Sequence, residues 1–411
     1  MAGEAGAAMG CLTRSSSSVE RALRADIERK QGEIAALRQQ IDALHASASW
    51  RLTAPLRSLM ESLRGRSNSE PATPPFGLPP LPASPPSPAP AQRLQLLAYD
   101  ADWQRPARTE EAAFRQIAAR LPADSEIEYI AFPWASLIDA INQWQPDAEY
   151  LLAAFLALQD LQPPGPRRVT VCQHIDIEVI APYLASAGIT DVFHSHARRD
   201  QAGHKVGGAR IHPFPLFAPQ LAPEREPADK DLLFSFVGAT AGAEYLSPVR
   251  DWIIADLADA PGACIKARPA WHYDQAVYGN DARTADELAA AETEYLDIMA
   301  RSVFALCPSG SGPNTLRLWE AMGAGVIPVI LSDNWQPPGP EALWRQAAVF
   351  WPETREGLTG LVDHLTVLNA DPDRLAQHRR AMTEIWQRYG PQDFVHDIMQ
   401  IATGEAAPAS I

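Results

Sequence analysis

From Arg93 onward, short apolar runs alternate with longer stretches of helical periodicity, and this alternation decides the fold class. A charged segment with prolines, residues 218–231, separates a first series of runs from a second. Strands that alternate with helices form a mostly parallel sheet whose faces the helices cover. We therefore predict an α/β chain with two doubly wound, Rossmann-like domains that face a cleft. The strand-like runs are RLQLLAYD, IEYIAFPW, RRVTVCQHID, DVFHSHA and RIHPFPLF, then LLFSFVGA, ACIKA, VFALCPSG, VIPVILSD and AVFWPE.

Residues 16–46 carry a heptad pattern that predicts a coiled-coil helix. Isoleucine at one core position and leucine at the other favour a parallel two-stranded coiled coil. We expect a homodimer through this helix, and docking on the same chain or on another protein is the alternative. The seam consists of Ile27, Ile34 and Ile41 with Leu23, Leu37 and Leu44.

Residues 47–66 predict a basic amphipathic helix, and residues 67–91 a proline-rich linker. The helix has an apolar face surrounded by arginines, so it suits either the surface of an anionic membrane or the end of the coiled coil. Ten prolines between residues 71 and 90 exclude a packed element and predict an extended spacer. We expect these segments to tether the rest of the chain. The apolar face is Leu56, Leu59, Met60 and Leu63.

The composition restricts partners and compartment. A formal net charge of -15 makes a nucleic acid an unsuitable partner. Four scattered cysteines form no metal or disulfide pattern, which is typical of a reducing compartment. No run approaches the ~20 apolar residues that span a bilayer, and the N-terminus lacks the charged-then-apolar pattern of a signal peptide. We expect a cytoplasmic protein, with peripheral contact at the inner face of the membrane through the basic helix.

Residues 307–333, CPSGSGPNTLRLWEAMGAGVIPVILSD, join a strand to a helix through a glycine-rich turn. Ligands of doubly wound sheets bind where strands end, glycines allow close approach, and a helix N-terminus attracts anions. Asn314 or Thr315 can cap this helix. Arg317 and Glu320 share one helix face, where they can bind a diphosphate and a ribose diol. The alternative is an ordinary strand-helix unit with a surface ion pair.

Residues 295–339 resemble the nucleotide-binding half of the exostosin family of glycosyltransferases. That family combines an SxFxLxPxG strand, a turn of small residues, RxxEA, GxIPVIxxD and a proline-containing loop in this order. The similarity is weaker across 230–350, where LLFSFVGA and Arg250 resemble the start of the donor domain, and 93–225 match only in architecture. The matching residues are Ser302, Phe304, Leu306, Pro308, Gly310, Arg317, Glu320, Ala321, Gly325, Ile327, Pro328, Val329, Ile330 and Asp333.

The resemblance implies a GT-B glycosyltransferase that uses a nucleotide-sugar, usually a UDP-sugar, and inverts the anomeric centre. Residues 92–225 would form the acceptor-side domain, for a glycan or a lipid-linked glycan. Residues 226–385 would bind the donor, and 386–411 would form a closing helix and tail. Thr315 stands where the family often has serine, so the hydroxyl is kept. The implied donor-binding residues are Gly238, Arg250, Ser309, Gly310, Ser311, Gly312, Asn314, Thr315, Arg317 and Glu320.

The implied reaction needs positive charge at the departing diphosphate and a base for the acceptor hydroxyl. The turn, the helix end and arginine meet the first need, so we expect no metal or other cofactor. Asp100 and Asp102 imitate the acidic pair of metal-dependent transferases, but they follow the first strand, so we interpret them as helix-capping acids. The candidate bases are Asp176 and His174, which we prefer, and His194 and His196, whose spacing also suits a zinc site that lacks further ligands.

Two other functions remain open at this point. The first alternative to an inverting transferase of surface polysaccharide synthesis is a retaining GT-B enzyme, because many of these share a glutamate-bearing helix before a G-x-P-V strand. The second, outside enzymes, is a scaffold that binds nucleotide without turnover and is recruited through its coiled coil. A loop with Trp271, His272 and Tyr273 offers rings either for a nucleobase or for its own core.

Overall fold

The computed structural model describes residues 94–105, 107–143, 145, 147–218, 230–242, 245–268 and 285–404. All of them belong to one unit of the chain, Pro88–Ile411. The predicted coiled coil, amphipathic helix and linker lie outside the described residues, as does the aromatic loop at 271–273. Within the described part, no helix is long and apolar enough to cross a membrane.

The first series of apolar runs forms a six-stranded sheet in the order β1-β2-β3-β4-β6-β5. Its strands are β1 (Leu96–Ala98), β2 (Glu128–Ala131), β3 (Arg168–Cys172), β4 (Asp191–His194), β5 (Lys205–Val206) and β6 (Ala209–Pro213). Its helices are α4 (Thr109–Arg120), α5 (Trp134–Asn142), α6 (Asp147–Gln159) and α7 (Ala181–Ser186), with 3-10 turns at Ile177–Ile180 and Arg199–Gln201.

The second series forms a five-stranded parallel sheet in the order β11-β10-β9-β7-β8. Its strands are β7 (Leu232–Ala239), β8 (Ala263–Arg268), β9 (Ser302–Pro308), β10 (Ile327–Leu331) and β11 (Val349–Phe350). The helices of this half are α8 (Val249–Leu257), α10 (Ala285–Arg301), α11 (Leu316–Gly323), α12 (Glu341–Ala347), α13 (Arg355–Leu358), α14 (Leu361–Asn369), α15 (Pro372–Tyr389) and α16 (His396–Ala402).

Each of the ten predicted runs contains a strand, and all neighbouring strands pair in parallel except β5 with β6. The two-sheet, Rossmann-like fold is thus confirmed. The sequence analysis missed only β5, a two-residue edge strand. Gly207 and Gly208 connect β5 to β6 with φ angles of 59° and 87°, which are the left-handed values that a two-residue hairpin turn requires.

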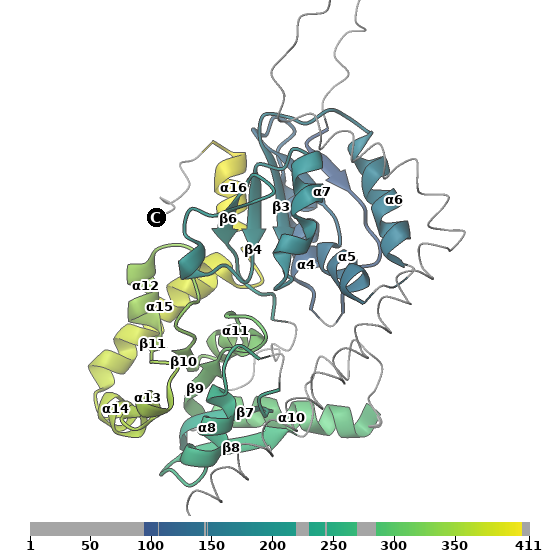
Figure 1. Ribbon diagram of the computed structural model, residues 1–411. Helices are drawn as coiled ribbons and strands as arrows, with labels where there is room; N and C mark the ends of the chain where they lie inside the picture. The colour runs from purple at the N-terminus through teal and green to yellow at the C-terminus, as the bar shows by residue number, and fades with distance from the viewer. Residues whose placement is uncertain are drawn as a thin grey trace, which may run out of the picture. The chain divides into compact units, whose positions relative to one another are not determined.

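Helices cover both faces of each sheet. Successive side chains of a strand point to opposite faces, so neighbouring strand residues pack with different helices. In the first sheet, Ile130 and Val192 pack with α5 and α6, whereas Tyr129 and Phe193 pack with α4 and α16. Helix α16 comes from the end of the described chain and lies beside β6 (Figure 1). The C-terminal segment therefore contributes to the core of the first sheet.

Candidate functional site

Strand β9, the turn after it and helix α11 form the strand-turn-helix unit that the sequence predicted. β9 is buried along its whole length between β10 and β7, and its carboxyl end places Ser309 at the edge of the sheet. The Ser309 N–H donates to the Leu331 carbonyl at 2.9 Å, and the Gly310 N–H donates to the Gly312 carbonyl at 3.0 Å. The fold itself thus uses two of the amides that the prediction had offered to a ligand.

Thr315 occupies the N-cap position of α11, as predicted, but neither Asn314 nor Thr315 caps the helix with its side chain. Thr315 is the N-cap residue and has extended backbone, but its side chain makes no capping hydrogen bond. The Asn314 amide group donates to the carbonyl of Ser195, in the first half of the chain, at 2.8 Å. Its Oδ1 accepts from the indole of Trp319 at 3.0 Å. Both ends of this amide are occupied, so Asn314 ties the turn to the first sheet.

Two arginines from different helices converge on Gly238 in strand β7. A Cβ atom at Gly238 would lie 2.7 Å from Arg317 Nη2 and 3.4 Å from Arg250 Nη1. The ring of Phe236 lies 4.6 Å from Arg317 Cζ and 5.9 Å from Arg250 Cζ. Tyr245 faces Arg250 from another side, with 4.6 Å between the ring centre and Cζ. Glycine is needed at position 238 because of this close approach, since its φ is not left-handed.

Among the described residues, neither guanidinium group has a carboxylate partner. Arg250 Nε donates to the Ser309 carbonyl at 2.9 Å, and Arg317 Nη2 donates to the Val237 carbonyl at 2.5 Å. Arg317 Nε and Nη1 are enclosed and make no hydrogen bond within the part of the chain that the structure describes. Burial, and then the charge of Arg317, lower the pKa of Arg250 to about 10, so it stays charged at neutral pH. An enclosed guanidinium with unused donors, beside a second buried cation, is costly alone, and the pair forms a suitable site for an anion.

Glu320 lies one helical turn after Arg317 and is buried. The Tyr295 hydroxyl of α10 donates to Glu320 Oε2 at 2.5 Å. Burial raises the pKa of Glu320, while the Tyr295 hydrogen bond and the charge of Arg317 oppose that rise. Tyr295 thereby fixes the orientation of the carboxyl group that the resemblance assigned to a ribose. The sequence analysis missed Tyr295, because no spacing rule relates a residue on α10 to one on α11.

Ser309 and Asp333 have structural partners in this region. The Ser309 hydroxyl donates to Glu353 Oε1, which also accepts from the hydroxyl of Ser247 at 2.7 Å. The Asp333 carboxylate accepts the backbone N–H of Glu353 at 3.2 Å. The side chain of Ser309 is therefore already occupied, and its carbonyl is what orients Arg250. Ser311 lies between the two turn glycines and is half-buried.

The other side of the turn contacts the loop that follows β4. A Cβ atom at Gly312 would lie 2.2 Å from His196 Nδ1 and 2.7 Å from Ile175 Cγ2, so only glycine fits against this ring. Backbone hydrogen bonds join the same loop to the segment after β10, from Gln336 N–H to the Ala197 carbonyl at 3.0 Å and from Arg199 N–H to the Asn334 carbonyl at 2.9 Å. The turn is thus held from both halves of the chain.

The four candidate bases lie at the carboxyl ends of β3 and β4. His174 Nε2 lies 3.2 Å from Asp139 Oδ1, and its Nδ1 accepts the N–H of Asp176 at 3.0 Å, so both ring nitrogens are occupied. Asp176 is exposed, and one of its oxygens accepts from Asn142 at 3.1 Å. Burial lowers the pKa of His194 to about 4, and its Nε2 is 2.9 Å from the His174 carbonyl. No group of three or more metal-ligating side chains occurs among the described residues.

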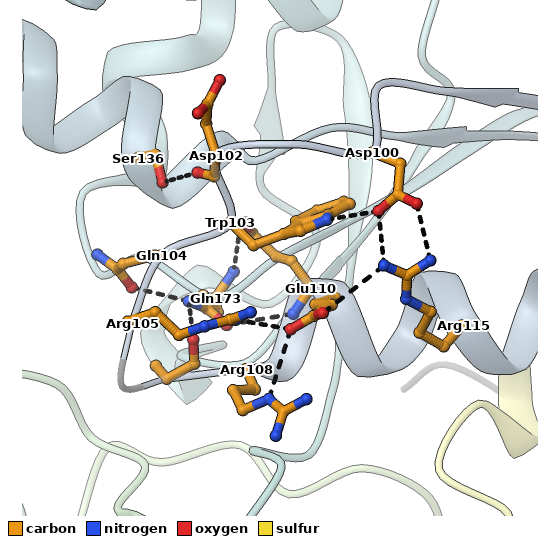
Figure 2. A network of polar contacts seen from close by, with 12 residues as sticks. Asp100, Asp102, Trp103, Gln104, Arg105, Arg108, Glu110, Arg115, Ser136 and Gln173 are labelled. Atoms are coloured by element: carbon orange, nitrogen blue, oxygen red, sulfur yellow. Dashed lines mark hydrogen bonds and ion pairs between the residues drawn. The ribbon is translucent and has the colours of Figure 1, made fainter.

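The acidic pair at Asp100 and Asp102 does not cap a helix, contrary to our interpretation. Asp100 accepts two hydrogen bonds from Arg115 at 2.7 and 2.8 Å and one from the Trp103 indole at 2.9 Å, whereas the carboxylate of Asp102 points away from this network (Figure 2). Asp102 accepts the hydroxyl of Tyr99 at 2.6 Å. Helix α4 begins at Thr109 and has no side-chain cap, so these acids stabilise the turn after β1, and Asp100 ties that turn to Arg115 of α4.

A buried carboxyl group that the sequence analysis missed is Glu110, in the first turn of α4. It accepts the backbone N–H groups of Gln173 at 3.0 Å and Ala135 at 3.2 Å, and Gln173 in turn donates to Gln104 (Figure 2). Burial raises the pKa of Glu110 to about 8, against the effect of these N–H groups. Glu110 joins α4, α5 and the end of β3, which positions the loop that carries His174.

Comparisons with known proteins place the similarity over the site just described. Residues 193–358 match the family model of the Exostosin GT47 domain. Exostosin-1a of Danio rerio is 32% identical over 97 residues, which are 23% of this chain and 13% of that protein. The probable glucuronosyltransferase GUT1 of Oryza sativa is 38% identical over 89 residues, 21% of this chain and 20% of that protein.

A third relative is the probable beta-1,4-xylosyltransferase IRX10 of Arabidopsis thaliana, 42% identical over 59 residues that are 14% of each chain. The chain thus spans a fifth or less of the length of these relatives. A solved S. aureus MnaA-UDP structure aligns at 11% identity over 62% of this chain and 80% of that chain, with a TM-score of 0.32. Residues 193–358 are therefore similar to the exostosin GT47 domain, in agreement with the resemblance that the motif around the glycine turn indicated.

Proposed function

We propose that this protein is a glycosyltransferase that moves a sugar from a nucleotide-sugar, most simply a UDP-sugar, to a glycan or lipid-linked glycan acceptor. The observation that carries the proposal is the meeting of Arg250 and Arg317 at Gly238 with no carboxylate partner among the described residues. The GT47 match covers this pair, the turn and Glu320. The names of the relatives, a glucuronosyltransferase and a xylosyltransferase, agree with sugar transfer.

In this proposal the donor diphosphate lies against the two guanidinium groups. Arg317 offers Nε and Nη1, which have no partner, and guanidinium groups bind phosphate oxygens through paired, charge-assisted hydrogen bonds. The ribose hydroxyls bind Glu320, whose carboxyl group Tyr295 holds in place. As the bond to the anomeric carbon breaks, negative charge grows on the diphosphate, and preorganised cations stabilise that charge. The site as proposed uses arginine rather than a metal ion for this purpose.

Inverting transfer also needs a base on the acceptor side, and we propose Asp176. Its carboxylate is exposed at the carboxyl end of β3, where an acceptor hydroxyl can reach it. His174 supports Asp176 by accepting its backbone N–H, and since both His174 nitrogens are occupied, His174 is the less suitable base. The attack is a single displacement in which the acceptor oxygen bonds to the anomeric carbon, the diphosphate leaves, and the acceptor proton passes to the base. The acceptor product belongs, in this proposal, to a surface polysaccharide.

A thermal-shift and calorimetric series with UDP, GDP, ADP and TDP tests the donor site. Binding to the folded state raises the melting temperature, so the preferred diphosphate identifies itself. Arg317→Ala should abolish both binding and transfer from a UDP-sugar in the presence of EDTA, and Glu320→Ala should abolish transfer. The matched control is Arg355→Ala, because Arg355 is an exposed arginine paired with Asp256.

The outcomes separate the alternatives. Unchanged turnover in both Arg317→Ala and Glu320→Ala would remove the site assignment. Retention of the anomeric configuration in the product would replace the inverting mechanism with a retaining one. Binding of UDP without transfer to any acceptor would favour the non-catalytic nucleotide-binding scaffold.

A further inference from the structure

His196 and Arg250 flank the same short turn from opposite sides. A Cβ atom at Gly310 would lie 3.5 Å from Arg250 Nη2, and one at Gly312 would lie 2.2 Å from His196 Nδ1. The two glycines are joined by the hydrogen bond from Gly310 N–H to the Gly312 carbonyl. An imidazole from the first half of the chain is therefore separated from the paired arginines by one turn of backbone.

The imidazole of His196 is in an unfavourable state in this structure. Its Nδ1 is enclosed and has no hydrogen-bond partner in the described segments, and its neighbours include the Gly312 backbone and the Ile175 methyl group. An enclosed nitrogen without a partner costs free energy, and a phenyl ring would fill the same space without that cost. Arg317 Nε and Nη1 are also enclosed without a partner. The turn at Gly310 and Gly312 thus has unused hydrogen-bonding atoms on both sides, on Arg317 and on His196.

We infer that His196 is a ligand of the donor diphosphate, so that the phosphates are bound from both halves of the chain. This inference rests on the proposed function. Gly310 and Gly312 carry no side chain that would hinder rotation of their peptide groups, so the turn can rearrange when a phosphate enters. The imidazole then hydrogen-bonds a phosphate oxygen. Asn314 keeps the turn next to the loop of His196 through its bond to the Ser195 carbonyl.

The charges around His196 set the sign of a pH effect. His194 and His174 lie on the side of the first sheet, with Arg198 beyond His194, and Arg250 and Arg317 lie beyond the turn. Burial, and then His194 and His174, hold the pKa of His196 well below its usual value, so the ring is neutral in the free protein. A bound phosphate raises that pKa. Protonation therefore accompanies binding, and affinity should increase as the pH falls.

The test is calorimetric measurement of the Kd of UDP between pH 5.5 and 8 for the full chain and three variants. His196→Phe keeps the ring volume and should bind UDP at least tenfold more weakly at pH 6, with an equal or higher melting temperature. His196→Asn keeps a hydrogen-bonding group near the Nδ1 position, so it should bind better than His196→Phe but without the added pH dependence. The terminal phosphate of UDP itself titrates near ~6, and the His196→Phe curve reports that contribution alone.

The UDP affinity of the wild type should rise more steeply with falling pH than that of His196→Phe. The extra gain approaches tenfold in affinity for each unit by which bound UDP raises the pKa of the His196 imidazole. The matched control is His204→Phe, since His204 is an exposed histidine paired with Glu178. If His196→Phe has the same Kd and slope as the wild type, the inference is overturned while the proposed function stands. If His196→Phe fails to fold, a His196→Asn curve parallel to the wild type overturns it equally. If the wild type itself binds no UDP, the proposed UDP-sugar donor fails first.

Discussion

Replacing Gly238 by alanine should weaken the proposed donor site much more than it weakens the stability of the fold. The new Cβ would lie 2.7 Å from Arg317 Nη2, whereas ordinary contact begins at 3.4 Å, so the guanidinium must withdraw by the difference. That movement weakens its hydrogen bond to the Val237 carbonyl, now 2.5 Å long. A hydrogen bond from a charged group is worth about 1.5–3 kcal/mol. Alanine also restricts the unfolded chain, which returns about 0.4–1 kcal/mol of stability.

The free energy of unfolding of Gly238→Ala should therefore fall by only about 1 kcal/mol, because these two contributions have opposite signs. The affinity for the donor gains nothing from the unfolded-state effect, because that effect acts only on folding. Displacing one of two converging guanidinium groups should weaken UDP binding about 10- to 100-fold, which corresponds to roughly 1.4–2.8 kcal/mol. Urea denaturation measures the stability, and calorimetry with UDP measures the affinity.

Gly360→Ala is the matched control, because a Cβ there meets only Trp351 at 3.8 Å. It should leave the UDP affinity unchanged and raise the free energy of unfolding by about 0.4–1 kcal/mol through the same restriction of the unfolded chain. The reasoning would be refuted if Gly238→Ala bound UDP as tightly as the wild type. It would also be refuted if affinity fell only in proportion to a general loss of folded protein.

The remaining predictions concern the base, a buried ion pair and a buried acid. Asp176→Asn should lower kcat by at least about 100-fold with little change in the Kd of UDP, since general base catalysis contributes roughly 10²–10⁴-fold; an unchanged kcat would exclude Asp176 as the base. Arg168→Met should cost about 3–5 kcal/mol in urea denaturation because it removes the cation 2.9 Å from buried Glu128 and leaves that carboxylate with neutral donors such as Gln162 and Gly165, and Arg168→Met with Glu128→Leu should recover part of that loss; no recovery would contradict the ion-pair explanation. Burial raises the pKa of Glu110 to about 8, so the folded state binds a proton that the unfolded state releases above about pH 4.5. The contribution of this group to the free energy of unfolding should therefore be complete below about pH 4.5 and be lost as the pH rises through 8. Glu110→Gln should abolish this decline in a pH series of denaturation curves. A decline that persists in Glu110→Gln would have to come from another group.

Helix and strand positions were predictable because they depend on local periodicity. The ten apolar runs became strands because burial on both faces of a parallel sheet requires continuous apolar sequence, as in Val169 to Cys172. The short strand β5 was not predicted, because two residues are too few to show the alternation of apolar and polar residues that marks a strand. Its glycine pair was the available signal, and a hairpin rule would have found it.

The proposed donor site was predictable in part. Arg317 and Glu320 were identified from their spacing on one helix, and Arg250 from the resemblance alone. The roles of Asn314 and Ser309 were not predictable, since Ser195 and Glu353, their partners, lie 119 and 44 residues away. A sequence shows which side chains can donate, but it does not show which donors the fold has already used.

The sequence by itself determined the alternation of strands and helices, the glycine-rich turn and the family of the domain, because these depend on residue order over tens of positions. Only the tertiary structure decided that two arginines meet at Gly238 without a carboxylate partner among the described residues, and that His196 contacts Gly312 from the first half of the chain. The physical reason is that charge and hydrogen bonding act over a few ångströms between residues far apart in the sequence. Which charges and hydrogen-bonding groups remain without a partner is therefore decided only after both sheets have formed.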